Sequence, residues 1–567
     1  MIKKNVIVKL HRTTLILGLS ASMNAGAATY DFQDQRQDEF ESPGQLLLTP
    51  DSFAHVPMDM DQEVMLQDEI EQNKSDYQHV LKLIKQHRQE EAEKKVAELL
   101  ASKPDVAVFH DLRALLNILD KDLAAAAKSY QQAIEVNPKD TLAYLGIAKL
   151  AMAENKLEQA KEYAEKGLAV NDKALQAYFI LADVALKQKN LLEVENILIT
   201  ALEKVKGNIP AELKTLKNLG KYYASQKKPE KILAISEELS NRYPKNNNVI
   251  SALVAAQLAN NQKDQAEQNL RRIIDRDKQD IKNRLLLASL LSQQAGKEKD
   301  ALALMDEAAK INPDQPQANY LKATYLIQLD RTQDAMEIAD KLDAQFPTLP
   351  LGKLLQGKAY IADKKLDKAT AAYKKAYQLQ ANNRILFTLA NLLNIQGKSE
   401  EAINMLNEAL LKKPNNLSLH YRLATIYQSQ NDTKLAESHY RIILDQQPDN
   451  VLALNNLAWM YAQQRNTKAL GLAEKAYTKA PKSAAIADTY GYILLQQGRP
   501  VDSLAILKEA AALAPKAIDI KYHLAEAYDA NGNKQKAAEI LEAIVNSEQD
   551  FAEKKEAIQL LKQIKAK

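Results

Sequence analysis

Eight histidines are the side chains of this 567-residue chain with the greatest capacity for acid–base or metal chemistry, and they are scattered along it. No pair of them has the His-Glu-x-x-His spacing that places two metal ligands on one helix face. The chain also lacks a glycine-rich phosphate loop and a Gly-x-Ser-x-Gly nucleophile turn. Cysteine is absent, which excludes disulfides and thiolate metal sites. We therefore expect no catalytic site, no metal and no cofactor, and we predict that the protein is not an enzyme.

Lysines provide the clearest candidate for electrostatic binding. Lys214, Lys217 and Lys221 are spaced so that they lie on one face of a helix. Such a basic patch would attract an acidic protein surface, an anionic glycan or the acidic segment of this same chain. The alternative is an ordinary solvated helix face.

A small residue that recurs at a nearly constant interval shows which elements must position these side chains. Eleven of fourteen recurring positions are alanine, and the interval leaves the range 33–35 only once, before Ile232. The positions are Ala92, Ala126, Ala160, Val194, Ile232, Ala266, Ala301, Ala335, Ala369, Ala402, Ala436, Ala469, Ser503 and Ala537. This period is typical of a solenoid of helical hairpins, in which each unit buries its apolar face on the next.

Prolines and glycines mark the ends of the predicted helices. Nine prolines share one phase of the repeat, where they end the second helix of a unit and precede the next unit. Gly296, Gly397, Gly498 and Gly532 fall between the paired helices, where we expect a left-handed backbone conformation. The small residues themselves allow two helices to approach closely.

The order of small, large and proline residues resembles the tetratricopeptide repeat. Residues that match its consensus occur in two units as Leu216, Leu219, Gly220, Tyr223 and Pro244, and as Leu454, Leu457, Ala458, Tyr461 and Pro481. The resemblance covers residues 73–550. It implies an all-α, right-handed superhelical solenoid of about fourteen helix-turn-helix repeats, followed by a capping helix at 551–567.

In this family ligands commonly lie in a concave groove lined by the first helix of each unit. Carried over to this chain, the resemblance implies a groove lined by Tyr320, Phe387, Asn391, Tyr421, Asn455, Trp459, Tyr492 and Tyr522. Aromatic faces and amides suit an extended peptide or a glycan. The alternative is that the aromatic rings stabilise helix packing. His420 and His523 also fall on first helices, and we interpret both as packing residues.

The N-terminal region has a different character from the repeats. Residues 1–27 resemble a cleavable secretory signal, with four basic residues, an apolar stretch at 14–23 and a small-x-small site ending at Ala27. Residues 28–72 hold twelve acidic residues against one arginine, which predicts a disordered acidic arm, with an acidic tether as the alternative. We expect an exported, periplasmic protein that is not a lipoprotein, has no transmembrane span after processing and does not bind nucleic acid.

A weaker resemblance concerns the C-terminal part, at residues 455–565. Three short segments are similar to sequences in exported repeat proteins of bacterial exopolysaccharide and exosortase (PEP-CTERM) systems. They are Asn455–Trp459, Ala473–Tyr477 and Asp488–Tyr492. The expected function is a non-catalytic periplasmic scaffold that binds an extended segment of an envelope protein. Glycan binding in exopolysaccharide export, and chaperoning of exported subunits, are the alternatives.

Overall fold

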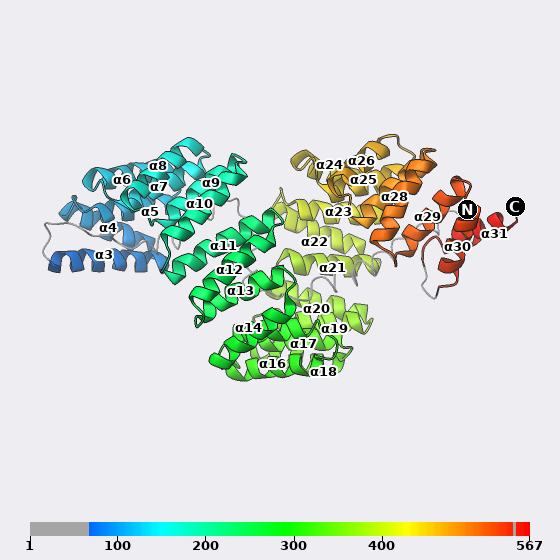
Figure 1. Ribbon diagram of the computed structural model, residues 1–567, viewed down its shortest axis with the longest axis horizontal. Helices are drawn as coiled ribbons and strands as arrows, with labels where there is room; N and C mark the ends of the chain where they lie inside the picture. Colours follow the sequence, from blue (N-terminus) through cyan, green and yellow to red (C-terminus); the bar gives the residue numbers. More distant parts are fainter. Residues whose placement is uncertain (1–66, 548–550, 567) are drawn as a thin grey trace. The chain divides into compact units, whose positions relative to one another are not determined.

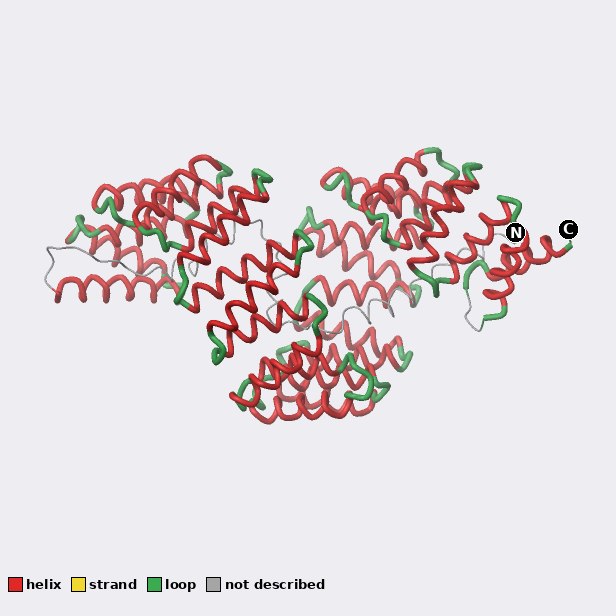
Figure 2. Tube along the Cα trace, in the orientation of Figure 1, coloured by secondary structure: helices red, strands yellow, loops and turns green. Residues whose placement is uncertain are grey.

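The computed structural model describes residues 67–547 and 551–566, and in these residues it contains 29 helices and no strand (Figure 1, Figure 2). The predicted signal at 1–27 and most of the predicted acidic arm lie outside the described residues. The first helix begins at Gln67, so the predicted boundary between arm and repeats, at residues 72 and 73, falls inside a helix. Alanine, leucine and long polar residues favour this helical content.

The helices divide into two compact units. The first to appear along the described chain contains α3 (Gln67–Lys85), α4 (Gln89–Ser102), α5 (Ala107–Leu119), α6 (Leu123–Val136), α7 (Thr141–Ala153), α8 (Leu157–Val170), α9 (Leu175–Lys187), α10 (Leu191–Lys204), α11 (Ile209–Ser225), α12 (Pro229–Arg242), α13 (Asn247–Ala259), α14 (Lys263–Arg276), α15 (Ile281–Leu291) and α16 (Glu298–Ile311).

The other unit contains α17 (Gln317–Gln328), α18 (Thr332–Gln345), α19 (Leu351–Ala362), α20 (Leu366–Leu379), α21 (Asn383–Ile395), α22 (Ser399–Lys412), α23 (Leu417–Ser429), α24 (Thr433–Gln446), α25 (Val451–Gln463), α26 (Lys468–Lys479), α27 (Ala484–Gln496), α28 (Pro500–Leu513), α29 (Ile518–Ala530), α30 (Lys534–Val545) and α31 (Lys554–Lys565). The pairs from α3/α4 to α29/α30 make fourteen hairpins, as the repeat predicts.

Within each of the two compact units, each hairpin packs on its neighbours along the chain. Contacts are extensive within pairs such as α5/α6 and α27/α28, and inside each unit the second helix of one pair packs on the first helix of the next. Successive first helices also touch, for example α7 with α9 and α25 with α27. Inside each compact unit, successive hairpins thus bury their apolar sides against one another, which is the packing of a helical solenoid.

The recurring small residue lies on the second helix of every hairpin and is buried there. All eleven alanines at this position are at most 1% exposed. The larger exceptions Val194 and Ile232 are buried as well, and Ser503 is fully buried. The prediction that this residue lies at close helix contacts is confirmed.

The short turns inside the hairpins share one backbone conformation. The four predicted glycines have positive φ, for example +77° at Gly397 and +72° at Gly498. Ten residues other than glycine hold the matching place in the other hairpins with φ between 54° and 64°, among them Lys121 and Lys189. The glycine prediction is confirmed, but it covered only four of the fourteen turns.

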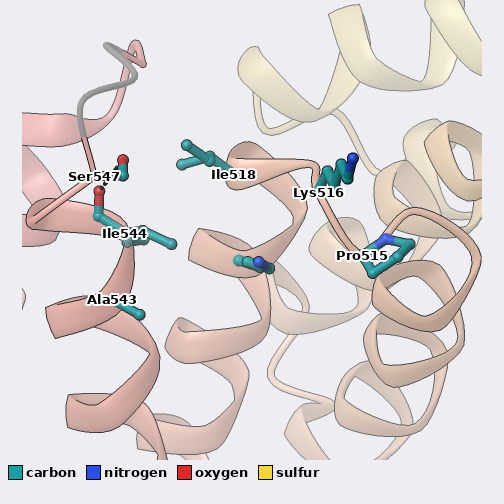
Figure 3. A pocket seen from close by; sticks show the side chains of 7 residues that line it. Pro515, Lys516, Ile518, Ala543, Ile544 and Ser547 are labelled. Atoms are coloured by element: carbon teal, nitrogen blue, oxygen red, sulfur yellow. Dashed lines mark hydrogen bonds between the residues drawn. The ribbon is translucent and has the colours of Figure 1, made fainter.

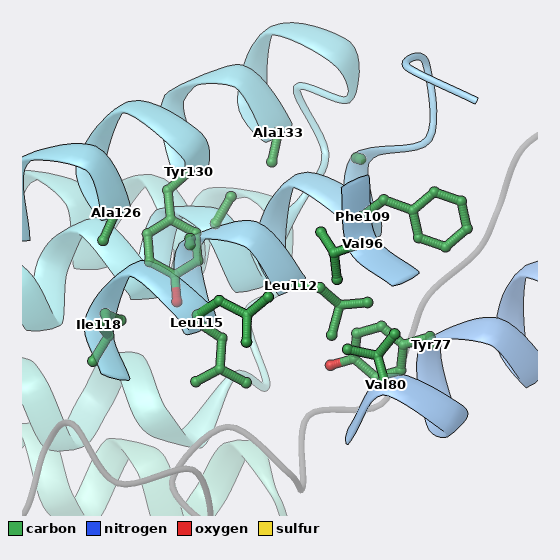
Figure 4. Packing of buried hydrophobic residues seen from close by; sticks show 14 of the residues in the cluster. Tyr77, Val80, Val96, Phe109, Leu112, Leu115, Ile118, Ala126, Tyr130 and Ala133 are labelled. Carbon is green, nitrogen blue, oxygen red and sulfur yellow. The ribbon is translucent and has the colours of Figure 1, made fainter. Parts of the chain in front are cut away.

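The core at the start of the repeats shows how large and small residues fit together (Figure 4). Tyr130 of α6 is almost fully buried, and Gly146 of α7 makes room for its ring. A Cβ atom at residue 146 would clash with that ring. At the other end of the chain, Ala557 and Ile564 of α31 are buried in one cluster with Leu541 of α30. Helix α31 therefore covers the last hairpin, as a capping helix does.

Candidate ligand-binding face

Side chains of the seven first helices from α17 to α29 form two series of contacts, one between α17 and α19 and the other from α21 to α29. We call this surface the first-helix face, and it comprises Lys358, Arg384, Phe387, Asn391, Tyr421, Arg422, Asn455, Trp459, Tyr492 and Glu526, with the residues that they contact on the same helices. The helices contribute one such layer per hairpin because the repeat places equivalent residues about one unit apart. All of these residues belong to the same compact unit.

The face begins with a lysine on an aromatic ring. Lys358 of α19 donates a hydrogen bond from Nζ to the hydroxyl of Tyr320 on α17, at 3.0 Å, and its Nζ lies 4.9 Å from the ring centroid. Burial, and then the charge of Arg384 on α21, lower the pKa of Lys358 to about 8. Tyr320 itself is only 2% exposed.

A second cation lies on an aromatic ring two hairpins further along the chain. The guanidinium of Arg422 on α23 lies 5.2 Å from the ring centroid of Phe387 on α21, a cation–π contact. Its Nη1 is 3.5 Å from Oδ1 of Asn391, at the outer limit of a hydrogen bond. Burial lowers the pKa of Arg422. Phe387 and Asn391 remain partly exposed, as expected for residues that line a surface.

A hydrogen-bond network occupies the middle of the face. Asn456 of α25 donates from Nδ2 to the hydroxyl of Tyr421 on α23, at 3.0 Å, and to that of Tyr440 on α24, at 3.2 Å. Tyr440 in turn donates to Oε1 of Gln428 at 2.8 Å. Tyr421 stays partly exposed while Tyr440 is fully buried. The network holds the ring of Tyr421 in place at the surface.

Three rings follow one another across α25, α27 and α29. The ring centroids of Trp459 and Tyr492 are 5.1 Å apart, and those of Tyr492 and His523 are 4.5 Å apart. Trp459 and Tyr492 are partly exposed, whereas His523 is buried. Nδ1 of His523 lies 2.8 Å from Oδ1 of Asp488, which is also buried. The interpretation of His523 as a packing residue is confirmed, and its partner is a carboxylate.

Two of the predicted groove residues are not exposed. Tyr320 is covered by Lys358, and Tyr522 is 7% exposed, in the apolar cluster beneath the last hairpin. The hydroxyl of Tyr522 donates to Oε1 of Glu526 at 3.0 Å. For these two tyrosines the packing interpretation holds, because a neighbouring helix covers each ring. The other six predicted residues are partly exposed: Phe387, Asn391, Tyr421, Asn455, Trp459 and Tyr492.

Several polar atoms on these first helices are buried without a hydrogen-bond partner in the described part of the chain. They are Oε1 of Gln317, Oγ1 of Thr324, Oδ1 of Asn455 and Oε2 of Glu526. A buried polar group usually has a partner, since leaving it unpaired costs about 1–3 kcal/mol. A ligand that donates hydrogen bonds would satisfy Asn455 and Glu526.

The predicted basic patch lies in the other compact unit, on α11. Lys214, Lys217 and Lys221 are all exposed, and Nζ of Lys214 lies 5.8 Å from the ring centroid of Phe179 on α9. Lys149 of α7 is buried nearby, where burial and the charge of Lys214 lower its pKa to about 8. The three lysines therefore face solvent together, next to a fourth basic residue that the sequence pattern did not include.

Histidines elsewhere also serve packing. His420 of α23 is buried, and its Nδ1 lies 2.9 Å from Nδ1 of His439 on α24. The ring of Tyr427 stacks on His439, with centroids 5.7 Å apart. This confirms the packing interpretation of His420. Among the described residues, no three histidine or carboxylate side chains are grouped so that they could hold a metal ion.

A shallow pocket of about 250 Å³ lies outside the first-helix face (Figure 3). Its lining comes from the loop before α29, from α29 and α30, and from the residues after α30: Pro515, Lys516, Ile518, Lys521, Ala543, Ile544 and Ser547. It shares no residue with the predicted groove. In the part of the chain that the structure describes, no helix is both long and apolar enough to span a bilayer.

Residues other than the eight predicted groove residues also shape the face. Arg384, Arg422 and Glu553 contribute charge to it, and Asp488 binds His523. The repeat period could have located the first three on or beside first helices, but it carries no information on which charges pair with one another.

Comparison with known proteins supports the repeat assignment. Two family models described as tetratricopeptide repeat match residues 145–193, 293–359, 421–484 and 494–564. A TPR repeat-containing protein of Pseudomonas aeruginosa is 25% identical over 240 residues, which is 42% of this chain and 35% of that protein. BBSome complex member BBS4 of Bos taurus is 25% identical over 226 residues, 39% of this chain and 43% of BBS4.

A shorter match concerns the type IV pilus assembly protein PilF of Pseudomonas aeruginosa. It is 28% identical over 121 residues, 21% of this chain and 48% of PilF. The matched regions thus span less than half of the length of each of these three relatives.

Proposed function

Because this chain belongs to the tetratricopeptide-repeat family, we propose that it is a non-catalytic scaffold whose first-helix face binds an extended segment of another protein. The observation that carries the proposal is the row of partly exposed rings and amides on successive first helices, above all Trp459 and Tyr492. An extended peptide crossing such a row would stack on the rings and pair its backbone with the amides. Unpaired Oδ1 of Asn455 offers one acceptor for a peptide N–H.

The cellular setting is part of the proposal. We place the protein in the periplasm with an envelope protein as its partner. The signal-like residues 1–27 support this location. A fusion of residues 1–72 to a reporter enzyme active only after export tests it. Export of the reporter is expected, and retention in the cytoplasm would contradict the proposed location.

A capture experiment tests the first-helix face. The full chain, the double variant Trp459→Ala/Tyr492→Ala and the control Tyr377→Ala are immobilised and exposed to solubilised envelope proteins. Tyr377 is a partly exposed ring on the second helix α20, so its loss removes similar area from a different face. We expect the double variant to lose a protein that the wild type and the control both retain, with circular dichroism unchanged. Equal retention by all three would exclude this face.

Glycan binding is the alternative that the sequence left open. Tryptophan fluorescence distinguishes it from binding of a protein segment. Trp459 is the only tryptophan, so its emission reports on this face alone. Anionic and neutral oligosaccharides are expected to leave the emission unchanged. A saturable change would favour a glycan ligand over a protein segment.

The basic patch on α11 is proposed as a second docking surface, for an acidic partner. Exposed lysines act through long-range attraction that salt screens within about 10 Å at 0.1 M ionic strength. Replacing Lys214, Lys217 and Lys221 by glutamine is expected to weaken partner binding at low salt and to leave the binding at high salt unchanged. Equal affinity of the variant and the wild type at low salt would show that the patch is an ordinary solvated face.

A further inference from the structure

One end of the first-helix face carries two cations, Lys358 and Arg422, whose hydrogen bonds and cation–π contacts are with uncharged side chains. Lys358 contacts the hydroxyl of Tyr320, and Arg422 contacts Phe387 and Asn391. No carboxylate of the described residues forms an ion pair with Lys358 or with Arg422. Both cations are partly withdrawn from water, which favours binding of an anion from outside.

The other end of the face carries carboxylates without lysine or arginine partners. Glu526 of α29 receives one hydrogen bond, from Tyr522, and its Oε2 is buried without a partner in the described part of the chain. Burial raises the pKa of Glu526 and that of Glu553, next to the start of α31. The nearby cation is His523, which Asp488 already neutralises. A cation from outside would stabilise this end.

Uncharged side chains separate the two ends. Tyr421, Asn455, Trp459 and Tyr492 lie on α23, α25 and α27, between Arg422 and Glu526 along the series of contacts. The centre therefore offers rings and an amide acceptor, and the charge lies at its two sides. This order is a property of the row as a whole, because each charge comes from a different hairpin.

We propose that the partner segment is a charge-separated extended peptide, with separate acidic residues that bind Lys358 and Arg422 and a basic residue that binds Glu526. The inference rests on the proposed function of the first-helix face. A free anion would satisfy only the cationic end and a neutral glycan would satisfy neither, whereas one polypeptide can carry both charges and an apolar centre.

The length of the segment follows from the helix spacing. The helices α23 and α29 are three first-helix steps apart, and packed helices lie about 10 Å from one another. The charges are then about 30 Å apart. An extended chain rises about 3.3 Å per residue, so about nine residues separate the acidic from the basic side chain.

The experiment is selection from a random dodecapeptide library displayed on phage, with the full chain as target and the Trp459→Ala chain for counter-selection. We expect the selected sequences to carry acidic residues at one end and basic residues at the other. A synthetic peptide of the selected consensus is then compared with a peptide in which the acidic and basic residues are exchanged. The exchanged peptide is expected to bind at least roughly ten-fold more weakly.

The outcomes separate this inference from the proposed function. Equal binding of the two peptides, or selected sequences without charge separation, would overturn the inference and leave the face as a peptide site. If no selected peptide depends on Trp459, both the inference and the proposed face are wrong. The comparison uses the wild-type chain, so it does not depend on the folding of a variant.

Charge reversal in the protein provides a second measurement. Glu526→Lys is expected to weaken binding of the consensus peptide at least roughly ten-fold, as is Arg422→Glu. The matched control is Lys375→Glu, because Lys375 is exposed on the second helix α20. Circular dichroism checks the fold of each variant. Loss of binding in the control to the same extent would show that the charge effect is not local to the face.

Discussion

His523 and Asp488 form a buried ion pair between α29 and α27, and its strength depends on pH. Burial by itself lowers the pKa of His523, but the charge and hydrogen bond of Asp488, with Glu526 and Glu553 further away, raise it to about 9. The histidine is therefore protonated in the folded protein at neutral pH. An ordinary histidine titrates near 6.5, so this pair stabilises the fold fully below about pH 6.5. That contribution is lost as the pH rises through about 9.

The prediction at the residue scale concerns the stability of α27 and α29. The free energy of opening of these helices is expected to fall by on the order of 3 kcal/mol between pH 6.5 and 9. Hydrogen exchange of their amides should therefore become faster over this range by more than the intrinsic effect of pH. His523→Gln removes the titrating group and with it this excess. The helices α5 and α6, far along the chain, are the internal reference. The same excess in His523→Gln would show that another group is responsible.

At the scale of elements, the turns inside the hairpins are held in a conformation that only glycine adopts without cost. Lys189, between α9 and α10, has φ of +60° and is exposed, and Gly397 holds the equivalent place with φ of +77°. An L-residue in this region is disfavoured by about 1–2 kcal/mol, while glycine is not. The solenoid tolerates ten such residues because the packed helices on both sides hold each turn.

Substitutions at the turns test whether a non-glycine residue there is strained. Lys189→Gly is expected to stabilise its hairpin by about 0.5–1 kcal/mol, and Gly397→Ala to destabilise its own by about 1 kcal/mol. The control Lys94→Gly, at an exposed position inside α4, is expected to destabilise by up to about 1 kcal/mol. Thermal denaturation followed by circular dichroism measures all three. A loss of stability in Lys189→Gly would show that the turn is not strained.

The capping helix is the second element with a testable role. Ala557 and Ile564 of α31 cover the apolar cluster of α29 and α30, including Leu541. Deletion of residues 551–567 exposes that cluster, and full burial of one large aliphatic side chain contributes about 1.5–3 kcal/mol. We expect faster hydrogen exchange in α29 and α30 and little change in α19 and α21. A chain that ends at Ala566 is the control, and equal exchange in both would contradict a capping role.

The described part of the chain is a series of hairpins, and within each compact unit the extensive contacts join near neighbours along the chain. Stability is then close to a sum of unit and interface contributions, so a long fragment should fold without the rest. The unit from Asn312 to Lys567 contains the entire first-helix face. This unit alone can therefore be used to measure whether folding and ligand binding need the rest of the chain.

A fragment of residues 312–567 is predicted to keep its helices. Its circular dichroism per residue is expected to match that of the full chain, and hydrogen exchange in α21–α27 to be unchanged. A fragment without helical signal, or with faster exchange throughout, would show that the two units depend on each other for folding.

Sequence alone was enough to predict the repeat, the fourteen hairpins and the buried small residue. These features are local, because each depends on the order of residues within about one repeat. Every hairpin buries an equivalent apolar face on its neighbour. The contacts that make the face were not predictable in this way. Arg422 lies on Phe387, and Lys358 covers Tyr320. Both contacts depend on side-chain rotamers that are determined by packing between adjacent hairpins.

The period could therefore place a residue on a first helix without deciding whether its side chain reaches solvent. Trp459 and Tyr522 were predicted on the same ground, yet one is partly exposed and the other is buried. The exposure of each ring depends on the residues of the hairpins on both sides, and so does the presence of a counter-charge for Lys358 or Glu526. Those neighbours are set by tertiary packing, since they lie a full repeat or more away in the sequence.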